Sequence, residues 1–151
     1  MSIFPTKILL ATDGSEEAAL AARTAVDLAQ KTGSELHVVY ARLIPPLASY
    51  SAAEGLATSE IDEEEAKKRF QGLLDEQVEK VEAEGGSVAQ AHLRIGRPDR
   101  EIVHLAEEIG AGLIVIGSRG LGGVRRALMG SVSDSVVRHA HCPVMVVRPE
   151  K

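Results

Sequence analysis

Five short hydrophobic runs alternate along the chain with longer stretches in which hydrophobic residues recur every three or four positions. The runs cover residues 7–11, 35–41, 88–95, 113–116 and 144–147. Their lengths are typical of β-strands, and the stretches between them have the periodicity of amphipathic helices. Because strands alternate with helices, we expect a parallel sheet that is covered by helices on both faces.

Four amphipathic helices are predicted, each with small or branched hydrophobic residues along one face. Ser15 is expected to cap the first helix, Gly33 to end it, and Pro98 to begin the third. The four hydrophobic faces consist of Ala18, Ala22, Ala25 and Ala29; of Phe70, Leu74, Val78 and Val81; of Ile102, Ala106 and Ile109; and of Val132, Val136 and Ala140.

The pattern predicts an α/β domain with a doubly wound, five-stranded parallel sheet in the strand order 3-2-1-4-5. Residues 88–95 alternate between apolar and polar side chains, which is typical of an edge strand with one wetter face. Val144–Val147 forms the opposite edge in this order, and it is apolar throughout. We therefore expect a homodimer that pairs through this strand; a covering loop is the alternative.

Length and charge restrict the class of protein. The chain has 151 residues, which predicts a single domain over residues 1–151. It carries 17 Lys and Arg against 22 Asp and Glu, a net charge of -5, so we expect no binding to nucleic acid or to a membrane surface. The single cysteine, Cys142, cannot form an internal disulfide, and no hydrophobic run is long enough to span a membrane. These features indicate a cytoplasmic protein.

Residues 42–59 lack periodicity and predict a long loop of unassigned role.

A glycine-rich segment after the fourth predicted strand carries the clearest chemical signal. Gly117, Gly120 and Gly130 lie along it, and Ser131 begins the next helix. Glycine allows backbone amides to converge on an anion, and a helix N-terminus adds unpaired N–H groups and a positive dipole end. The hydroxyls of Ser131 and Ser133 can donate to phosphate oxygens. These features favour a phosphate-binding segment.

The alternative is structural: Ser131 and Asp134 have the spacing of a capping box, and the glycines then provide only a flexible connection. The sequence lacks both the Walker loop and a G-x-G-x-x-G after the first strand. In open α/β sheets, ligands bind beyond the carboxyl ends of the strands where the strand order reverses. We therefore expect Thr12 and Asp13, after the first strand, to face Gly117 across one crevice.

The spacing of these residues resembles the nucleotide signature of the universal stress protein family, specifically of its ATP-binding branch. That signature is G-x2-G-x9-G-[S/T], and Gly117, Gly120, Gly130 and Ser131 match it at every spacing. The resemblance extends over essentially the whole chain, through KILLATDGSEEA, LHVVY, GRPDREIVHLA, LIVIGSRG and GSVSDSVVRHAHCPVMVVR. It implies the five-stranded fold described above and a dimer through the last strand.

The resemblance also implies which residues contact ATP. Ala11 and Thr12 are expected where the first strand meets the nucleotide, and Asp13 near the ribose or a phosphate-bound Mg²⁺. The backbone of Val38 is expected to recognise adenine. The ribose and phosphates are expected against Gly117, Ser118, Arg119 and Gly120, and the terminal phosphates against Gly130, Ser131, Val132 and Ser133. The alternatives are a capping role for Asp13 and a core role for Val38.

Family resemblance implies a nucleotide-responsive regulatory module in stress tolerance, with adenine nucleotide as ligand and an unidentified protein partner. Two alternatives remain. One is a slow ATPase in which Asp13 and Arg119 assist hydrolysis, although the sequence shows no clear water-orienting residue. The other is a dimeric interaction protein that binds no nucleotide.

Histidines elsewhere in the chain are expected to be structural. His139, His141 and Cys142 are of the residue types that bind zinc, but a fourth ligand is not evident in the sequence. His37 lies within an apolar strand and is expected to be a hydrogen-bonded core residue.

Overall fold

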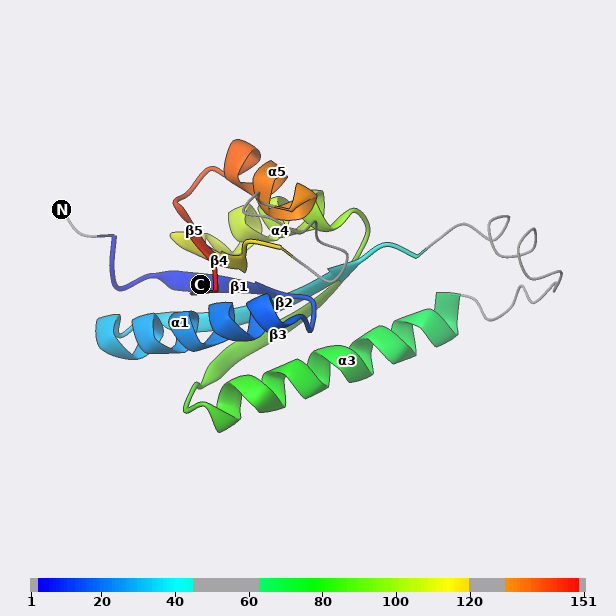
Figure 1. The fold of residues 1–151 in the computed structure, drawn as a ribbon, viewed down its shortest axis with the longest axis horizontal. Helices are drawn as coiled ribbons and strands as arrows, with labels where there is room; N and C mark the ends of the chain where they lie inside the picture. The colour runs from blue at the N-terminus through cyan, green and yellow to red at the C-terminus, as the bar shows by residue number, and fades with distance from the viewer. Residues whose placement is uncertain (1–2, 45–62, 120–129, 150–151) are drawn as a thin grey trace, which may run out of the picture.

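The computed structural model describes residues 3–44, 63–119 and 130–149, and it contains one parallel sheet (Figure 1). The strand order is β3-β2-β1-β4-β5, which confirms the predicted order. The strands are β1 (Lys7–Thr12), β2 (Glu35–Arg42), β3 (Val88–Ile95), β4 (Leu113–Gly117) and β5 (Val144–Val147). Three of them extend one residue further at the carboxyl end than the hydrophobic runs predict.

Two helices cover each face of the sheet (Figure 1). On one face lie α1 (Glu16–Thr32) and α3 (Glu63–Ala83), and on the other α4 (Pro98–Ile109) and α5 (Ser131–His139). The predicted ends of α1 are confirmed. The Ser15 hydroxyl accepts a hydrogen bond from the Ala18 amide at 3.1 Å, and Gly33 follows the helix in the left-handed conformation, at φ 72°.

The hydrophobic core has two layers because alternate residues of each central strand point to opposite faces. Ile8 and Leu10 of β1 pack toward α1 and α3, whereas Leu9 and Ala11 pack toward α4 and α5. In α1 the buried face is built from small residues, with Ala21 and Ala25 fully buried. Their short side chains allow α1 to lie close to the sheet, which matters for the site described below.

The edge strands occupy the predicted positions. In β3 the polar residue Arg94 pairs with Glu101 at 3.0 Å and Glu108 at 2.8 Å. His37, on the neighbouring β2, is buried and contacts His92 Nε2 at 3.2 Å and Glu35 Oε1 at 3.1 Å, which confirms it as a hydrogen-bonded core residue.

Strand β5 forms the other edge and, within the described residues, pairs only with β4. Met145 of β5 is 37% exposed, and Val137 on the adjacent α5 is also exposed. The edge is therefore apolar, as expected. A homodimer through Val144–Val147 stays a prediction.

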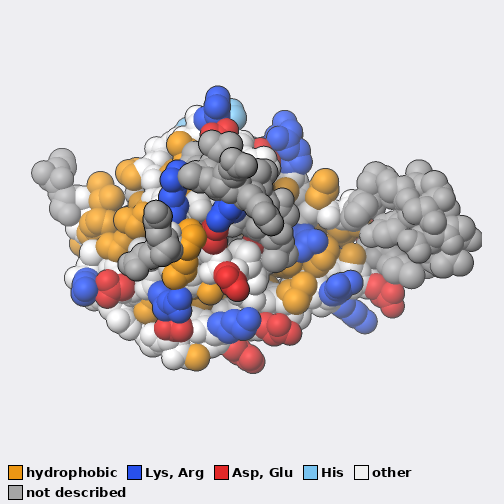
Figure 2. All heavy atoms as spheres, in the orientation of Figure 1, with side chains coloured by type: hydrophobic (Ala, Val, Ile, Leu, Met, Phe, Trp, Pro, Cys, Tyr) orange, Lys and Arg blue, Asp and Glu red, His pale blue; other side chains and the backbone are white. Residues whose placement is uncertain are grey.

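Charges of opposite sign are interspersed over the face that α1 and α3 present to solvent (Figure 2). Asp27 and Lys31 of α1, for example, form an ion pair at 3.2 Å. None of the helices in the described ranges is both long and apolar enough to cross a membrane. Most of the predicted loop at 42–59 lies outside the described residues.

Gly72 in the middle of α3 provides a stability test of the fold. Apart from its chain neighbours and the backbone of its own helix, a Cβ atom at this position meets no described atom within 4 Å, so Gly72→Ala is expected to raise the free energy of unfolding by about 0.5–1 kcal/mol through helix propensity alone. Gly33→Ala is the matched control, and it should lower stability because Gly33 has a positive φ. Urea unfolding curves of both variants measure the effect; a destabilised Gly72→Ala would contradict the expectation.

Candidate functional site

A cavity of about 380 Å³ opens at the carboxyl ends of the central strands. It lies where the strand order reverses between β1 and β4, the usual ligand position in open α/β sheets. Most of the residues predicted to bind the nucleotide line it, although they come from three separate parts of the chain. These are Ala11, Thr12, Asp13, Gly117, Arg119, Gly130, Ser131, Val132 and Ser133.

Three predicted residues stand apart. Val38 is fully buried in mid-strand, where it pairs with Leu10 of β1 and Ala91 of β3, and it does not line the cavity. Ser118 is buried between Gly117 and Arg119 in sequence, and unlike them it does not line the cavity. Gly120 lies outside the described residues.

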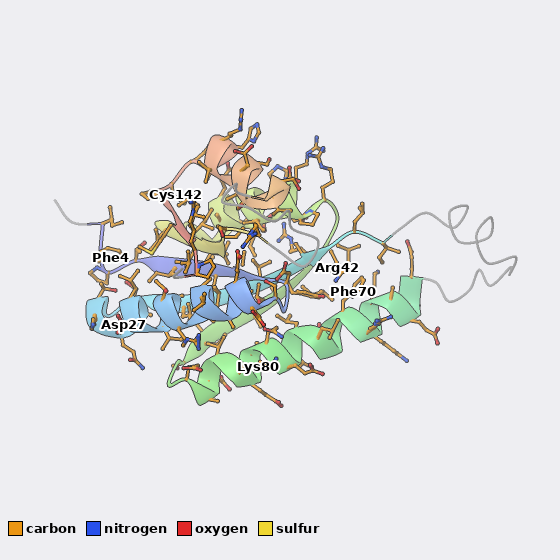
Figure 3. All side chains as sticks on the ribbon, in the orientation of Figure 1. Phe4, Asp27, Arg42, Phe70, Lys80 and Cys142 are labelled. Carbon is orange, nitrogen blue, oxygen red and sulfur yellow. The ribbon has the colours of Figure 1, made fainter. Side chains whose placement is uncertain are left out.

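The last two residues of β2, Ala41 and Arg42, line the cavity instead of Val38. The carboxyl end of this strand faces the same edge as the ends of β1 and β4. Arg42 is held in place by the Tyr40 hydroxyl, to which its Nη1 donates at 2.8 Å, and its guanidinium lies 5.1 Å from the centre of the Phe70 ring. Figure 3 shows Arg42 and Phe70 close together where β2 passes α3.

The turn between β1 and α1 places Asp13 at the cavity. Its Oδ1 accepts a hydrogen bond from the Ser15 amide at 2.9 Å, and Gly14 follows it with a positive φ of 85°. Asp13 therefore stabilises the turn before α1, as its alternative interpretation holds, and lines the cavity as well. The two roles are compatible because a carboxylate can accept several hydrogen bonds.

The N-terminus of α5 forms the opposite wall. Gly130 is the N-cap residue, Ser131 is the first helical residue, and no side chain in the described part of the chain caps the helix. The predicted alternative, a capping box of Ser131 and Asp134, is therefore not formed. Asp134 pairs with Arg138 at 3.0 Å instead. The first N–H groups of a helix have no partner within it, so α5 directs these donors and the positive end of its dipole toward the cavity that Gly130 and Ser131 line.

Ser133 lines the cavity as well, but its hydroxyl makes a hydrogen bond within the protein. Its hydroxyl donates to the Ser118 carbonyl at 2.7 Å, and the residue is only 2% exposed. The Gly130 amide also donates to the Ser118 carbonyl, at 2.6 Å. The Ser133 hydroxyl thus links α5 to the end of β4. Ser131, by contrast, is exposed.

Glu17 in the first turn of α1 organises the segment after β4. Its Oε1 accepts hydrogen bonds from the Ser118 hydroxyl at 2.7 Å and from the Arg119 amide at 2.6 Å. Its Oε2 accepts from Arg119 Nε at 3.0 Å and from Nη2 at 2.8 Å. One carboxylate therefore fixes both the backbone and the side chain of this segment.

Gly117 allows α1 and β4 to approach closely. A Cβ atom at this position would lie 3.0 Å from the backbone carbon and oxygen of Glu17. The glycine is thus required by helix–strand packing, and not only by the approach of a ligand to the backbone.

The profile of the universal stress protein family matches residues 5–148. The chain belongs to this family. It is 37% identical over 145 residues to a universal stress protein of Methanocaldococcus jannaschii, and the aligned region covers 96% of this chain and 83% of the relative. It is also similar to the solved structure of protein MJ0577, with a TM-score of 0.73 and 25% identity over 97% of each chain. A third relative is the universal stress protein of Archaeoglobus fulgidus in complex with dAMP, with a TM-score of 0.64 and 27% identity over 97% of this chain and 99% of the other.

In this universal stress protein, the residues considered for zinc make separate contacts. His139 Nδ1 contacts the Ser135 carbonyl oxygen at 2.9 Å, and His141 Nδ1 lies 2.7 Å from Glu107 Oε2. Cys142 is half-buried among apolar residues, and this burial raises the pKa of its thiol. Across residues 3–44, 63–119 and 130–149, no three potential metal ligands gather at one point.

The contacts of Glu17 predict a pH dependence of stability. Burial tends to raise the pKa of this carboxyl, but the hydrogen bonds from Ser118 and Arg119 outweigh burial and hold the pKa below its usual value of 4.5. A carboxyl group whose pKa is lowered by folding stabilises the folded protein at pH values above its pKa in the unfolded chain. This stabilisation is lost as the pH falls through the pKa of the group in the folded protein. Unfolding free energies of the native chain and of Glu17→Gln should therefore differ most above about pH 4.5 and converge at lower pH. A difference that is constant with pH would contradict this assignment.

Proposed function

We propose that this universal stress protein binds ATP with Mg²⁺ in the cavity and acts as a nucleotide-responsive regulatory module in stress tolerance. The observation that carries the proposal is the position of the α5 N-terminus, which faces the turn after β1 across one cavity and has no side-chain cap from the described residues. A helix N-terminus and glycine-flanked amides are a common phosphate-binding arrangement. The G-x2-G-x9-G-[S/T] spacing supports the same ligand class.

The shape and chemistry of the cavity support a ligand with an apolar ring and an anionic tail. Ala41, Ile102 and Ile116 provide apolar lining, and Ser131 and Val132 mark the helix end on which phosphates would lie. The relative from Archaeoglobus fulgidus has been solved with dAMP, an adenine nucleotide. We infer an adenine nucleotide for this chain as well, with Ala41 and Arg42 of β2 near the base.

Asp13 fits a role in holding Mg²⁺. It contributes the one carboxylate among the described residues that line the cavity. Magnesium is usually bound through one or two carboxylates together with substrate phosphates and water. The ion would therefore bind with the nucleotide, and it would reduce the negative charge of the phosphates.

The test is to denature freshly purified protein, identify the released small molecules, and measure thermal unfolding of the stripped protein with and without ATP–Mg²⁺. At a free ligand concentration about 100-fold above the dissociation constant, binding adds about 2.7 kcal/mol to the free energy of unfolding. Guanosine triphosphate is the control for the base. If the folded protein releases no adenine nucleotide and ATP does not stabilise it, the proposal is wrong.

We also propose a homodimer through β5 in the cytoplasm, which presents the module to a protein partner. The apolar edge of β5 supports this assembly because an unpaired edge strand readily pairs with another chain. Sedimentation equilibrium tests it: a mass of 16.0 kDa, that of one chain, would exclude the dimer.

A further inference from the structure

The carboxylate of Glu17 occupies donors that lie beside the proposed phosphate site. Within the described residues, it receives the Ser118 hydroxyl, the Arg119 amide and the Arg119 guanidinium. A hydroxyl, a backbone amide and an arginine are also the groups that usually bind phosphate oxygens. The Glu17 carboxylate is thus an anion of the protein itself, and it is bound by groups of Ser118 and Arg119 that could also bind the phosphate of a ligand.

Partial burial strengthens the electrostatic effect of the Glu17 carboxylate on its surroundings. The Glu17 side chain is only 12% exposed and that of Arg119 26% exposed, so solvent screens the pair less than it screens a surface ion pair. Arg119 lines the cavity, whereas Glu17 is not among its lining residues. A guanidinium that pairs with Glu17 has less capacity to neutralise a ligand phosphate, and the carboxylate itself repels that phosphate.

We propose that Glu17 is a specificity-determining residue that limits how strongly the site favours highly phosphorylated nucleotides. The inference rests on the proposed function and deepens it. Glu17 competes with the phosphates for Arg119, so each further phosphate adds less affinity than the cavity would otherwise allow. Glu17 acts through Arg119, and it is therefore a positioning residue for the anion site.

Glu17→Gln separates this role from simple support of the segment. The glutamine amide has the same shape and keeps one oxygen that can accept from Ser118 and Arg119, but it removes the charge and the acceptor for the guanidinium. A purely structural role predicts weaker or equal binding of every ligand. The specificity role predicts tighter binding that grows with ligand charge.

The experiment measures dissociation constants of adenosine, AMP, ADP and ATP at fixed Mg²⁺ for the native chain and for Glu17→Gln. We expect adenosine affinity to change by less than about twofold, and ATP affinity to rise about tenfold, with AMP and ADP between them. Equal changes for all four ligands, or no gain for ATP, would overturn the inference.

Arg119→Gln provides a second, independent test. This variant removes the guanidinium and leaves the Glu17 charge without its ion-pair partner, so it should weaken ATP binding about tenfold and leave adenosine binding unchanged. In the double variant no guanidinium remains that Glu17→Gln could release to the phosphates. Glu17→Gln should therefore raise ATP affinity less in that background than in the native chain, and the combined effect should differ from the sum of the single effects. Additive effects contradict the competition. If the native chain binds none of the four ligands, the proposed function itself fails and the inference fails with it.

Discussion

Replacing Ser131 with Glu is expected to weaken ATP binding at least about 100-fold, which corresponds to about 2.7 kcal/mol. Ser131 is the exposed first residue of α5 and lines the cavity at the N-terminus of this helix. A carboxylate there would occupy the positive end of the helix and repel the phosphates. Two unit charges about 4 Å apart interact by about 4 kcal/mol at an effective dielectric constant near 20. Repulsion by one added charge is therefore large enough to account for the expected loss of binding free energy.

The fold of Ser131→Glu should remain intact. An acidic residue in the first turn of a helix is favourable by about 0.3–1 kcal/mol, so the melting temperature should be unchanged or slightly higher. Ser131→Gln is the matched control, since it has the same size without the charge and should bind ATP much more tightly than Ser131→Glu. Isothermal titration of both variants measures the difference. Equal affinities would show that phosphates do not bind at this helix end.

Gly117→Val is expected to destabilise the protein by about 1–3 kcal/mol, the range for overpacked core positions. The new Cβ atom would lie 3.0 Å from the backbone of Glu17, so α1 must move away from β4 or the strand must shift. Nucleotide affinity should also fall, because the Glu17 contacts to Ser118 and Arg119 depend on this close approach. Loss of binding in this variant therefore reports on packing as well as on the site.

Gly72→Val is the control for that effect, with the same side chain added at an exposed helix position where no atom lies within 4 Å. Its free energy of unfolding should stay within about 0.5 kcal/mol of the native value, because valine and glycine differ little in helix propensity. Urea unfolding of the two variants provides the comparison. If Gly117→Val is as stable as Gly72→Val, the close contact between α1 and β4 is not required.

The sheet could be predicted from the sequence because each strand is marked locally. In β3 and β5 the hydrophobic pattern gives the observed bounds, Val88–Ile95 and Val144–Val147. The other strands end one residue later, at Thr12, Arg42 and Gly117, where the backbone still pairs although the hydrophobic run has ended. Hydrophobic periodicity reflects the burial of side chains and not the pairing of backbones. It therefore does not identify a last strand residue that is paired but not hydrophobic.

The site could be predicted only in part, because its chemistry depends on contacts between distant segments. The glycine spacing and the start of α5 are local signals, and the predicted helix start at Ser131 is observed. Glu17 is a different case, since it contacts Ser118 and Arg119 across more than 100 residues of sequence. In the sequence it appears only as an acidic residue in the first turn of a helix. Its role follows from the strand order, which brings α1 beside the end of β4.

Position along a strand and the direction of a hydroxyl account for two other observations. The family resemblance predicts an adenine contact at Val38, whereas the residues of β2 that line the cavity are Ala41 and Arg42, three and four residues further along the strand. Ser133 has the residue type of a phosphate donor, but its hydroxyl turns back to the Ser118 carbonyl. A sequence identifies a hydroxyl and its approximate place in the fold; which acceptor it reaches depends on a rotamer and on the neighbouring backbone.

The most direct test of the central claim is an NMR titration of the stripped, isotope-labelled protein with ATP–Mg²⁺, followed at the backbone amides. The account predicts saturable binding, with the largest shifts at the amides around the cavity, from Thr12 and Asp13, from Gly117 and Arg119, and from residues 130–133. Saturable shifts confined to another part of the surface, or a spectrum that ATP leaves unchanged, would contradict the nucleotide site at the carboxyl ends of β1 and β4.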